Sequence, residues 1–356
     1  MHLHGLFIYM MKKQLKNLLS LSLLFLFISC SNQDNSKELF SFTGSTMGTT
    51  YSIKIVEDPS VDKNSLTTIK TEVDSVLKEV NRQMSTYIPT SELSILNKEK
   101  RNKWIPISKD FAYVLSKSIE MGKESNGALD ITVGPLVNLW GFGPKEQSRI
   151  IPADSEIIKT MELTGLDKID VRLDPPSAIK KIDELYCDLS ATAKGFGVDK
   201  VAQYLSGRGY KNFLVEIGGE LNARGLNHKG EKWLVGISTP DHTGRVEYAI
   251  GLSNYAMATS GDYWNYFEEN GVRYSHTIEP LTGKPITHKL ASVTVLDSTC
   301  LMADGLATAI DVMGPEKGLE FATKRNLAIY MIVRKGEGFY IIKSPKFIEL
   351  YDEKGK

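Results

Sequence analysis

Segments with the alternating pattern of a β-strand occur in runs along this chain, and segments with helical periodicity separate the runs. Residues 50–56 alternate in this way and predict a strand, whereas residues 65–84 place apolar side chains three and four positions apart and predict an amphipathic helix. The order lacks strict strand–helix–strand alternation, and the sequence has no internal repeat or Pro/Gly/Ser-rich linker. We therefore expect an α+β fold with two intertwined lobes of mixed or antiparallel sheet and packed helices, rather than a doubly wound parallel sheet.

The same two patterns predict the other elements. Helices are expected at residues 111–124, 157–164, 195–207, 300–313 and 316–324, and strands at residues 213–217, 233–237, 245–252, 256–259, 328–334 and 338–342. The last two strands are expected to form a terminal hairpin. The Gly- and Pro-rich stretch 132–152 is predicted to be a loop, and Gly314 with Pro315 is predicted to end the helix that begins at Cys300.

The composition is that of a folded protein without a strongly charged surface. The 356 residues include 43 Lys and Arg against 43 Asp and Glu, and 42% of the residues are hydrophobic. A chain of this length and composition can bury a sizeable core. The absence of any Lys/Arg run gives no electrostatic footprint for nucleic acid, so no nucleic-acid partner is expected.

The N-terminus has the features of an export signal. Lys12, Lys13 and Lys16 precede an almost wholly apolar stretch, residues 18–28, which is too short to span a bilayer. Cys30 follows a small residue at the end of this stretch, an arrangement that resembles the lipobox of bacterial lipoproteins. An ordinary signal peptide with an incidental Cys30 is the alternative, and a cleaner signal would start at Met11.

These features divide the chain into a lipoprotein signal peptide at residues 1–29, a lipidated Cys30 with a polar tether to residue 41, a domain at 42–345 and a C-terminal tail at 346–356. Removing residues 1–29 deletes three Lys residues and no acidic residue, which leaves 40 basic against 43 acidic residues and a net charge of −3. The other two cysteines, Cys187 and Cys300, could pair in an oxidising compartment, but we expect both to be buried and free.

Three segments in the first half suggest a ligand pocket, each with a plainer alternative. The segment GSTMGT, residues 44–49, would let backbone approach a ligand closely or would form a simple turn. Tyr87, at a predicted helix exit, could stack on a planar ligand or belong to the core. The segment GALDITVGP, residues 127–135, sets Asp130 before an apolar run and a loop containing Gly, Trp and Phe, which suits a flat heterocycle. It lacks the glycine pattern of a phosphate-binding loop.

Two further segments suggest phosphate and metal binding. The segment DLSATAKGFG, residues 188–197, leads into a helix whose free N–H groups and Lys194 would favour a phosphate, although a capped turn is the alternative. Asp304 and Thr308 are four residues apart and share one face of a predicted helix. A carboxylate with a hydroxyl suits Mg²⁺ rather than zinc, although such a pair can also be incidental.

Taken together, these segments resemble the ApbE family, the FAD:protein FMN transferases of bacterial envelopes. The resemblance extends from about residue 42 to residue 333, and many members of the family are lipoproteins. It rests most strongly on GALDITVGP at 127–135, DLSA at 188–191, SHTIEPLTG at 275–283 and ADGLATA at 303–309. It implies an ApbE-like, T-fold-related architecture. Glu279 stands where the family usually has Asp before this proline, a small change within a turn.

The resemblance also implies roles for particular residues. The FAD contacts that it implies are Met47, Tyr87, Ala128, Leu129, Asp130, Asp188, Lys194, His276 and Ile278. The magnesium ligands that it implies are the backbone carbonyl of Ala191 and the side chains of Asp304 and Thr308, with Mn²⁺ as a substitute metal. His276 is the expected proton-transfer group, Asp188 and Lys194 are expected to assist catalysis, and Asp130 or Asp188 is the reserve base.

The activity that the resemblance implies is Mg²⁺-dependent transfer of FMN from FAD to a threonine hydroxyl of a partner redox protein, with release of AMP. The expected acceptors are flavoprotein subunits of a sodium-pumping NADH:quinone reductase or of an Rnf-type complex. The expected location is the bacterial cell envelope, with a lipid anchor in a membrane and the domain facing the periplasm or the exterior. A metal-dependent FAD pyrophosphatase and a non-catalytic FAD-binding lipoprotein are the alternatives.

Overall fold

The computed structural model describes residues 37–57, 63–143, 151–241, 243–261, 266–269 and 271–352. The chain divides into two units, Met1–Ser36 and Lys37–Lys356, and all of the described residues belong to the second. The predicted signal peptide, Cys30 and the first part of the predicted tether lie outside the described residues. Among the helices that are described, none is long and apolar enough to cross a membrane.

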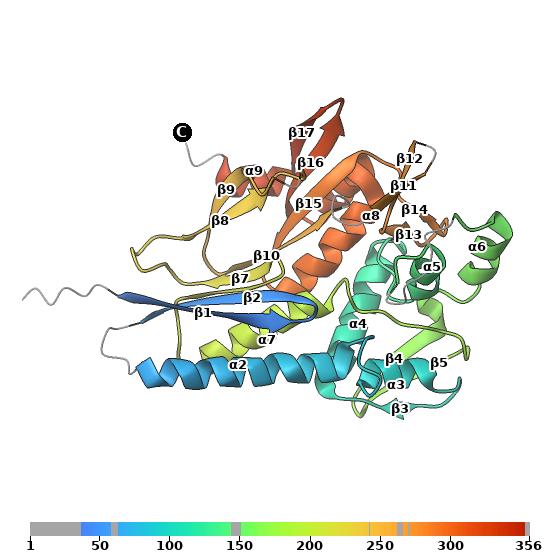
Figure 1. Cartoon of the computed structure of the whole chain (residues 1–356), viewed down its shortest axis with the longest axis horizontal. Helices are drawn as coiled ribbons and strands as arrows, with labels where there is room; N and C mark the ends of the chain where they lie inside the picture. The colour runs from blue at the N-terminus through green and yellow to red at the C-terminus, as the bar shows by residue number, and fades with distance from the viewer. Residues whose placement is uncertain are drawn as a thin grey trace, which may run out of the picture. The chain divides into compact units, whose positions relative to one another are not determined.

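Among the described residues, the largest sheet has eight strands in the order β1-β2-β6-β7-β10-β15-β16-β17, and every neighbouring pair is antiparallel (Figure 1). The strands are β1 (Glu38–Thr46), β2 (Thr49–Glu57), β6 (Phe213–Ile217), β7 (Glu220–Arg224), β10 (Tyr255–Gly261), β15 (Leu290–Asp297), β16 (Ala328–Lys335) and β17 (Gly338–Lys343). Helices occupy separate stretches between these strands, so the expected α+β class is confirmed.

The two faces of this sheet are covered by different elements. Phe213 and Val215 of β6 pack into a core with helices α2 (Lys63–Met84) and α7 (Ala193–Gly207), whereas Leu214 between them packs into a separate core on the opposite face. This alternation follows from the two-residue period of a strand. Helix α8 (Cys300–Lys324) packs against β10 and β15 beside α7. The hairpin of β8 (Trp233–Ser238) and β9 (Val246–Leu252) covers the opposite face together with α9 (Pro345–Tyr351).

A second lobe is built from two separate parts of the chain. Its first part contains α3 (Glu92–Lys98), β3 (Ile105–Pro106), α4 (Lys109–Glu124), α5 (Gly134–Leu139), α6 (Asp154–Met161), the short 3₁₀ helix η2 (Leu166–Lys168), β4 (Ile169–Leu173) and β5 (Pro176–Lys180). Its second part contains the hairpins β11 (Tyr266–Glu269) with β12 (Val272–Ser275) and β13 (Ile278–Glu279) with β14 (Lys284–Pro285). Because the chain leaves the large sheet and returns to it, the two lobes are intertwined as expected.

A hydrogen bond and a small apolar core join these two parts. The indole N–H of Trp140, just after α5, donates to the carbonyl oxygen of Gly283 at 2.8 Å. Leu136, Ile157 and Ile278 pack with Trp140 and are each nearly inaccessible to solvent. The loop predicted for residues 132–152 is therefore wrong in part, since α5 forms within it and is packed rather than free.

Most predicted elements are present with small shifts at their ends, and β6 has the predicted bounds. Gly314 interrupts α8 with φ of 77°, a left-handed conformation that suits glycine, so the predicted helix end is observed as a kink. Strands β1, β7 and β15 were not among the predicted elements. Cys187 and Cys300 are both buried and free, as expected.

The end of the chain differs from the predicted tail. Ser344 caps helix α9, and Phe347 on this helix is completely buried. The Lys343 ammonium lies 4.4 Å from the ring centroid of Tyr248 and 5.5 Å from that of Tyr330, and it forms an ion pair with Asp352 at 2.8 Å. These contacts join β9, β16, β17 and α9 into one packed cluster, which we call the C-terminal clamp.

Candidate active site

The start of α7 lies beside a cavity of about 630 Å³ that also borders the β1–β2 turn and the end of α2. We call this cavity the α2–α7 pocket. Four of the predicted site residues line it, namely Met47, Tyr87, Asp188 and Lys194. The other residues around it are Gly48, Val80, Asn81, Met84, Ser85, Thr86, Ile88, Ser190 and Ala193. The fold thus brings together residues that are far apart in sequence.

Met47 and Gly48 form the tight turn between β1 and β2, and both have positive φ, 50° and 72°. This turn directs the Met47 side chain toward the first turns of α7. A β-carbon built on Gly197 would lie 2.9 Å from the Met47 methyl carbon. Gly197 therefore lets the methionine approach the helix closely enough to line the pocket.

Tyr87 follows α2 and is 75% exposed, so the alternative that it belongs to the core is wrong. Its backbone N–H donates to the Ser85 hydroxyl at 3.1 Å, which holds the turn after the helix. Ser91 accepts a hydrogen bond from the Ser94 N–H and caps α3. An exposed phenol ring on the rim of a pocket is available to stack on a planar ligand.

Helix α7 begins against helix α8, and their contact places Lys194 beside Asp304. The backbone N–H of Gly195 donates to Asp304 Oδ2 at 2.9 Å. A β-carbon on Gly195 would come within 2.3 Å of the carbonyl oxygen of Cys300, so only glycine fits this approach. The Lys194 ammonium forms an ion pair with Glu220, the first residue of β7.

Burial has the largest effect on the pKa values of the two carboxyl groups in this cluster, those of Asp304 and Glu220. It raises the pKa of Asp304 to about 8, with the Lys194 charge opposing the shift and Glu220 reinforcing it. Burial also raises the pKa of Glu220 against the opposing charge of Lys194. Burial by itself would lower the pKa of Lys194, but the charges of Asp304 and Glu220 outweigh it and raise that pKa. Two buried carboxyl groups share one ammonium, so these three groups carry one net negative charge when both carboxyl groups are ionised.

The residues near Asp304 fit a hard divalent cation. Asp304 and Thr308 lie one turn apart on α8, with Thr308 only half-buried. Ala191 packs against the core that α8 shares with the large sheet, and Thr192 next to it lies against Gly305. A carboxylate, a hydroxyl and a backbone carbonyl supply the all-oxygen donors that Mg²⁺ prefers. The described residues contain no cluster of three or more His, Cys, Asp or Glu side chains suited to a metal, so any Mg²⁺ here would keep water or substrate oxygens as ligands.

Asp130 and Asp188 each accept hydrogen bonds within a local turn. Asp130 accepts from the N–H and the hydroxyl of Thr132, at 2.7 and 2.6 Å. Burial raises its pKa against these two hydrogen bonds. Asp188 accepts from the Ser190 N–H at 2.7 Å, while its own N–H donates to the carbonyl oxygen of Ile131 at 2.7 Å. The segments around Asp130 and Asp188 therefore lie side by side, and each carboxylate stabilises its own turn.

The segment containing His276 is connected to α8 rather than to the α2–α7 pocket. The His276 ring meets the ring of Phe142 edge to face, with centroids 6.4 Å apart. The next residue, Thr277, donates its hydroxyl hydrogen to Asp311 Oδ2 at 3.2 Å. Asp311 is seven residues after Asp304, so it lies on the same face of α8. Neither His276 nor Ile278 lines the α2–α7 pocket.

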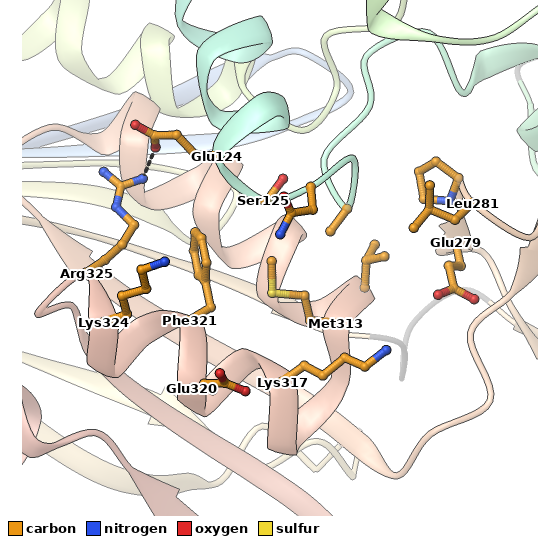
Figure 2. A pocket seen from close by; sticks show the side chains of 14 residues that line it. Glu124, Ser125, Glu279, Leu281, Met313, Lys317, Glu320, Phe321, Lys324 and Arg325 are labelled. Carbon is orange, nitrogen blue, oxygen red and sulfur yellow. Dashed lines mark hydrogen bonds and ion pairs between the residues drawn. The ribbon is translucent and has the colours of Figure 1, made fainter.

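Ala128 lines a second cavity of about 580 Å³, shown in Figure 2. Its walls combine apolar side chains, including Met313 and Phe321, with charged ones. The charged residues are Glu124, Glu279, Lys317, Glu320, Lys324 and Arg325. An ion pair joins Glu124 to Arg325 across one end (Figure 2). Leu129, in contrast, is buried in the core, so any ligand contact from it would come from its backbone.

Sequence reasoning missed three carboxylates that support the site. Asp199 accepts from the N–H groups of Cys300 and Leu301 at 2.8 and 2.9 Å and so fixes the start of α8 against α7. Glu220 pairs with Lys194, and Asp311 holds Thr277. The seven-residue spacing from Asp304 could have indicated Asp311. No local signal could have indicated Glu220, because its partner is brought to it by the sheet.

Comparison with known proteins agrees with this architecture. The ApbE family model matches residues 47–331. An FAD:protein FMN transferase from Haemophilus influenzae is 44% identical over 349 residues, covering 97% of this chain and 100% of that protein. One from Vibrio cholerae is 44% identical over 331 residues, covering 93% and 97%. The chain belongs to the ApbE family.

Solved structures of the family have the same fold. The flavin transferase ApbE from Vibrio cholerae aligns with a TM-score of 0.81 and 43% identity, over 88% of this chain and 99% of that one. The apo form of the Pseudomonas stutzeri flavinyl transferase ApbE aligns with a TM-score of 0.81 and 37% identity, over 88% and 97%. The ApbE-like fold expected from the sequence is therefore confirmed.

Proposed function

We propose that this protein transfers the FMN part of FAD to a threonine hydroxyl of a partner redox protein and releases AMP. The names of its relatives support the transfer of FMN from FAD to a protein. The observation that carries the proposal is the meeting of Lys194 and Asp304 beside a pocket lined by Met47 and Tyr87. A cationic side chain and a helix N-terminus suit a pyrophosphate, and the exposed phenol ring suits a flat heterocycle.

The reaction is a substitution at phosphorus. The acceptor oxygen forms a bond to the phosphorus on the FMN side of FAD, and the bond from that phosphorus to the oxygen bridging to AMP breaks. The acceptor proton passes to a base, and AMP leaves as a phosphate monoester. Lys194 stabilises the charge that develops on the phosphate oxygens. A Mg²⁺ ion held by Asp304, Thr308 and the Ala191 carbonyl would supply further neutralisation of the pyrophosphate when bound.

His276 is the residue that we propose as the base. An imidazole has a pKa near neutrality, and a positioned base contributes about 10²–10⁴-fold to a rate. The hydrogen bond from Thr277 to Asp311 ties the segment that contains His276 to the helix that contains Asp304. Asp130 and Asp188 are weaker candidates because each already accepts hydrogen bonds within its own turn.

We also propose that the protein is a lipoprotein of the bacterial cell envelope, anchored to a membrane through Cys30. The basic stretch, the apolar stretch and the cysteine after a small residue support this proposal. The proposed acceptors are flavoprotein subunits of sodium-pumping NADH:quinone reductases or Rnf-type complexes. A protein acceptor in the envelope would meet the transferase on the same side of the membrane.

A single incubation separates transfer from the alternatives. The protein is mixed with FAD, Mg²⁺ and one of the proposed acceptor subunits, and the acceptor is examined by mass spectrometry while the nucleotides are separated by chromatography. An acceptor that gains the mass of FMN together with release of AMP supports the transferase. Free FMN and AMP with an unmodified acceptor would indicate an FAD pyrophosphatase, and intact FAD would indicate a flavin-binding lipoprotein.

A further inference from the structure

Glu220 is a buried carboxylate that the mechanism above does not use. It follows the turn formed by Gly218 and Gly219, both of which have positive φ, and it opens strand β7 with 2% of its surface exposed. Its Oε1 atom accepts from the Lys194 ammonium. Within the described part of the chain, its Oε2 atom is buried and has no hydrogen-bond partner. A buried carboxylate with one oxygen unsatisfied is costly, which calls for a physical reason.

Lys194 separates Glu220 from the pocket. The Lys194 side chain is 32% exposed and lines the α2–α7 pocket, whereas the Glu220 side chain is 3% exposed and does not line it. The carboxylate therefore lies behind the ammonium. Asp304 lies close to the same lysine, because the N–H of Gly195, the next residue along the chain, donates to Asp304 Oδ2 at 2.9 Å. One flexible lysine is thus attracted by two buried carboxylates with different tasks.

We propose that Glu220 is a positioning residue that holds the Lys194 ammonium at the pocket floor and away from Asp304, which leaves Asp304 free for a divalent cation. The inference rests on the proposed function, since it assumes that Asp304 is a metal ligand. A lysine on a four-carbon stem that loses one buried partner turns to the other, because a buried unpaired charge is strongly unfavourable. Without Glu220, Lys194 would occupy Asp304 and compete with the metal.

The test is a double-mutant cycle read out by metal binding alone. Mg²⁺ is titrated calorimetrically into the wild type, Glu220→Gln, Lys194→Met and the double variant, without FAD and without turnover. We expect Glu220→Gln to weaken Mg²⁺ binding about tenfold, the size typical of contacting charges. In the Lys194→Met background the same change should have little effect, because no ammonium remains to occupy Asp304. An equal loss in both backgrounds would overturn the proposal, since Glu220 would then attract the cation directly.

Glu216→Gln is the matched control. Glu216 lies on the neighbouring strand β6 and accepts from the Gly219 N–H at 2.7 Å, a hydrogen bond that glutamine can keep. This change removes a nearby carboxylate without touching Lys194 and should leave Mg²⁺ binding close to that of the wild type. If Glu220→Gln does not fold, as judged by circular dichroism, Glu220→Asp takes its place in the cycle. If Glu220→Asp weakens Mg²⁺ binding equally with and without Lys194→Met, the proposal is again contradicted.

The double-mutant cycle and the transfer assay test separate claims, so either claim can fail without the other. If the wild type binds Mg²⁺ and the cycle behaves as expected, but no FMN reaches an acceptor, the transferase proposal fails and the role of Glu220 stands. If the wild type binds no Mg²⁺, the role of Glu220 is overturned, while the mass of the acceptor still decides whether FMN is transferred.

Discussion

The backbone N–H of Gly195 donates to the carboxylate of Asp304 at 2.9 Å, and this one hydrogen bond joins the first turn of α7 to α8. It brings the residue proposed to bind phosphate, Lys194, next to the residue proposed to bind the metal. Both helices pack on the same face of the large sheet as α2, so packed secondary structure fixes the positions of Lys194 and Asp304. The site therefore depends on the packing of helices rather than on a mobile loop.

Asp304 supplies the only carboxylate in the proposed metal site, so its loss should abolish transfer at ordinary Mg²⁺ concentrations. We expect Asp304→Ala to be partly rescued by high Mg²⁺ or by Mn²⁺, and Thr308→Ala to show a milder defect of the same kind. The measurement is FMN transfer against metal concentration, with circular dichroism as the folding control. Full activity of Asp304→Ala in the presence of a chelator would refute the metal assignment.

The metal-free protein should become less stable as pH rises toward 8. The pKa of Asp304 is raised to about 8 by burial, so its proton stabilises the folded state fully below about pH 4, and this stabilisation is lost as pH rises through about 8. We expect the melting temperature in a chelator to fall between about pH 5 and 8. Asp304→Asn should flatten this part of the curve. An unchanged slope in Asp304→Asn would show that another group is responsible.

His276→Ala should lower the transfer rate while leaving the affinity for FAD nearly unchanged, because a base acts in the transition state. The expected loss is about 10²–10⁴-fold. Flavin fluorescence on titration measures FAD binding separately from the rate. If affinity falls as much as the rate, His276 is a ligand contact and the base lies elsewhere.

Two glycines of α7 should respond differently to the same substitution. A β-carbon at Gly195 would lie 2.3 Å from a backbone oxygen, so Gly195→Ala should destabilise the fold by about 3 kcal/mol or more. At Gly197 the nearest atom is the flexible end of Met47, at 2.9 Å. Gly197→Ala should therefore fold with nearly normal stability but bind FAD several-fold more weakly. Urea unfolding and fluorescence titration test the two expectations, and equal destabilisation by both would contradict them.

Cys30→Ala should release the protein from membranes into the soluble envelope fraction. A lipoprotein anchor with more than one acyl chain holds a protein stably, and removing the modified residue removes all of the chains. Fractionation followed by immunoblotting compares the variant with the wild type. If Cys30→Ala stays in the membrane fraction, the cysteine is incidental and the signal is of the ordinary kind.

The elements that sequence periodicity predicted well are those whose pattern matches their burial. Residues 213–217 form β6 as predicted because the segment is almost wholly apolar and both faces of the strand are covered. Strand β7 was missed because its five residues contain no β-branched or aromatic side chain, and Glu220, Asn222 and Arg224 leave only Leu221 and Ala223 as apolar positions. Glu220 and Asn222 are nonetheless almost completely buried, and their partners Lys194 and Asp199 come from α7.

The site was likewise predicted only in part, because some of its contacts join elements that are distant in sequence. Motif resemblance indicated Met47, Tyr87, Asp188 and Lys194, and the structure places all four around one pocket. The pairing of Lys194 with Glu220 could not be predicted, because it depends on the position of β7 in the sheet relative to the start of α7. Spacing along a helix is visible in a sequence, whereas a contact between a helix and a strand becomes visible only once the strand order is known.

The C-terminal clamp has a consequence for how this protein can be made. Phe347 of α9 packs with Tyr330 and Ile332 of β16 on one face of the large sheet and is completely buried. A version cut before α9 would expose apolar side chains of β16 to water, so the segment predicted as a tail cannot be removed without loss of native packing. Any shortened version should therefore keep the residues up to Asp352, whose carboxylate pairs with Lys343.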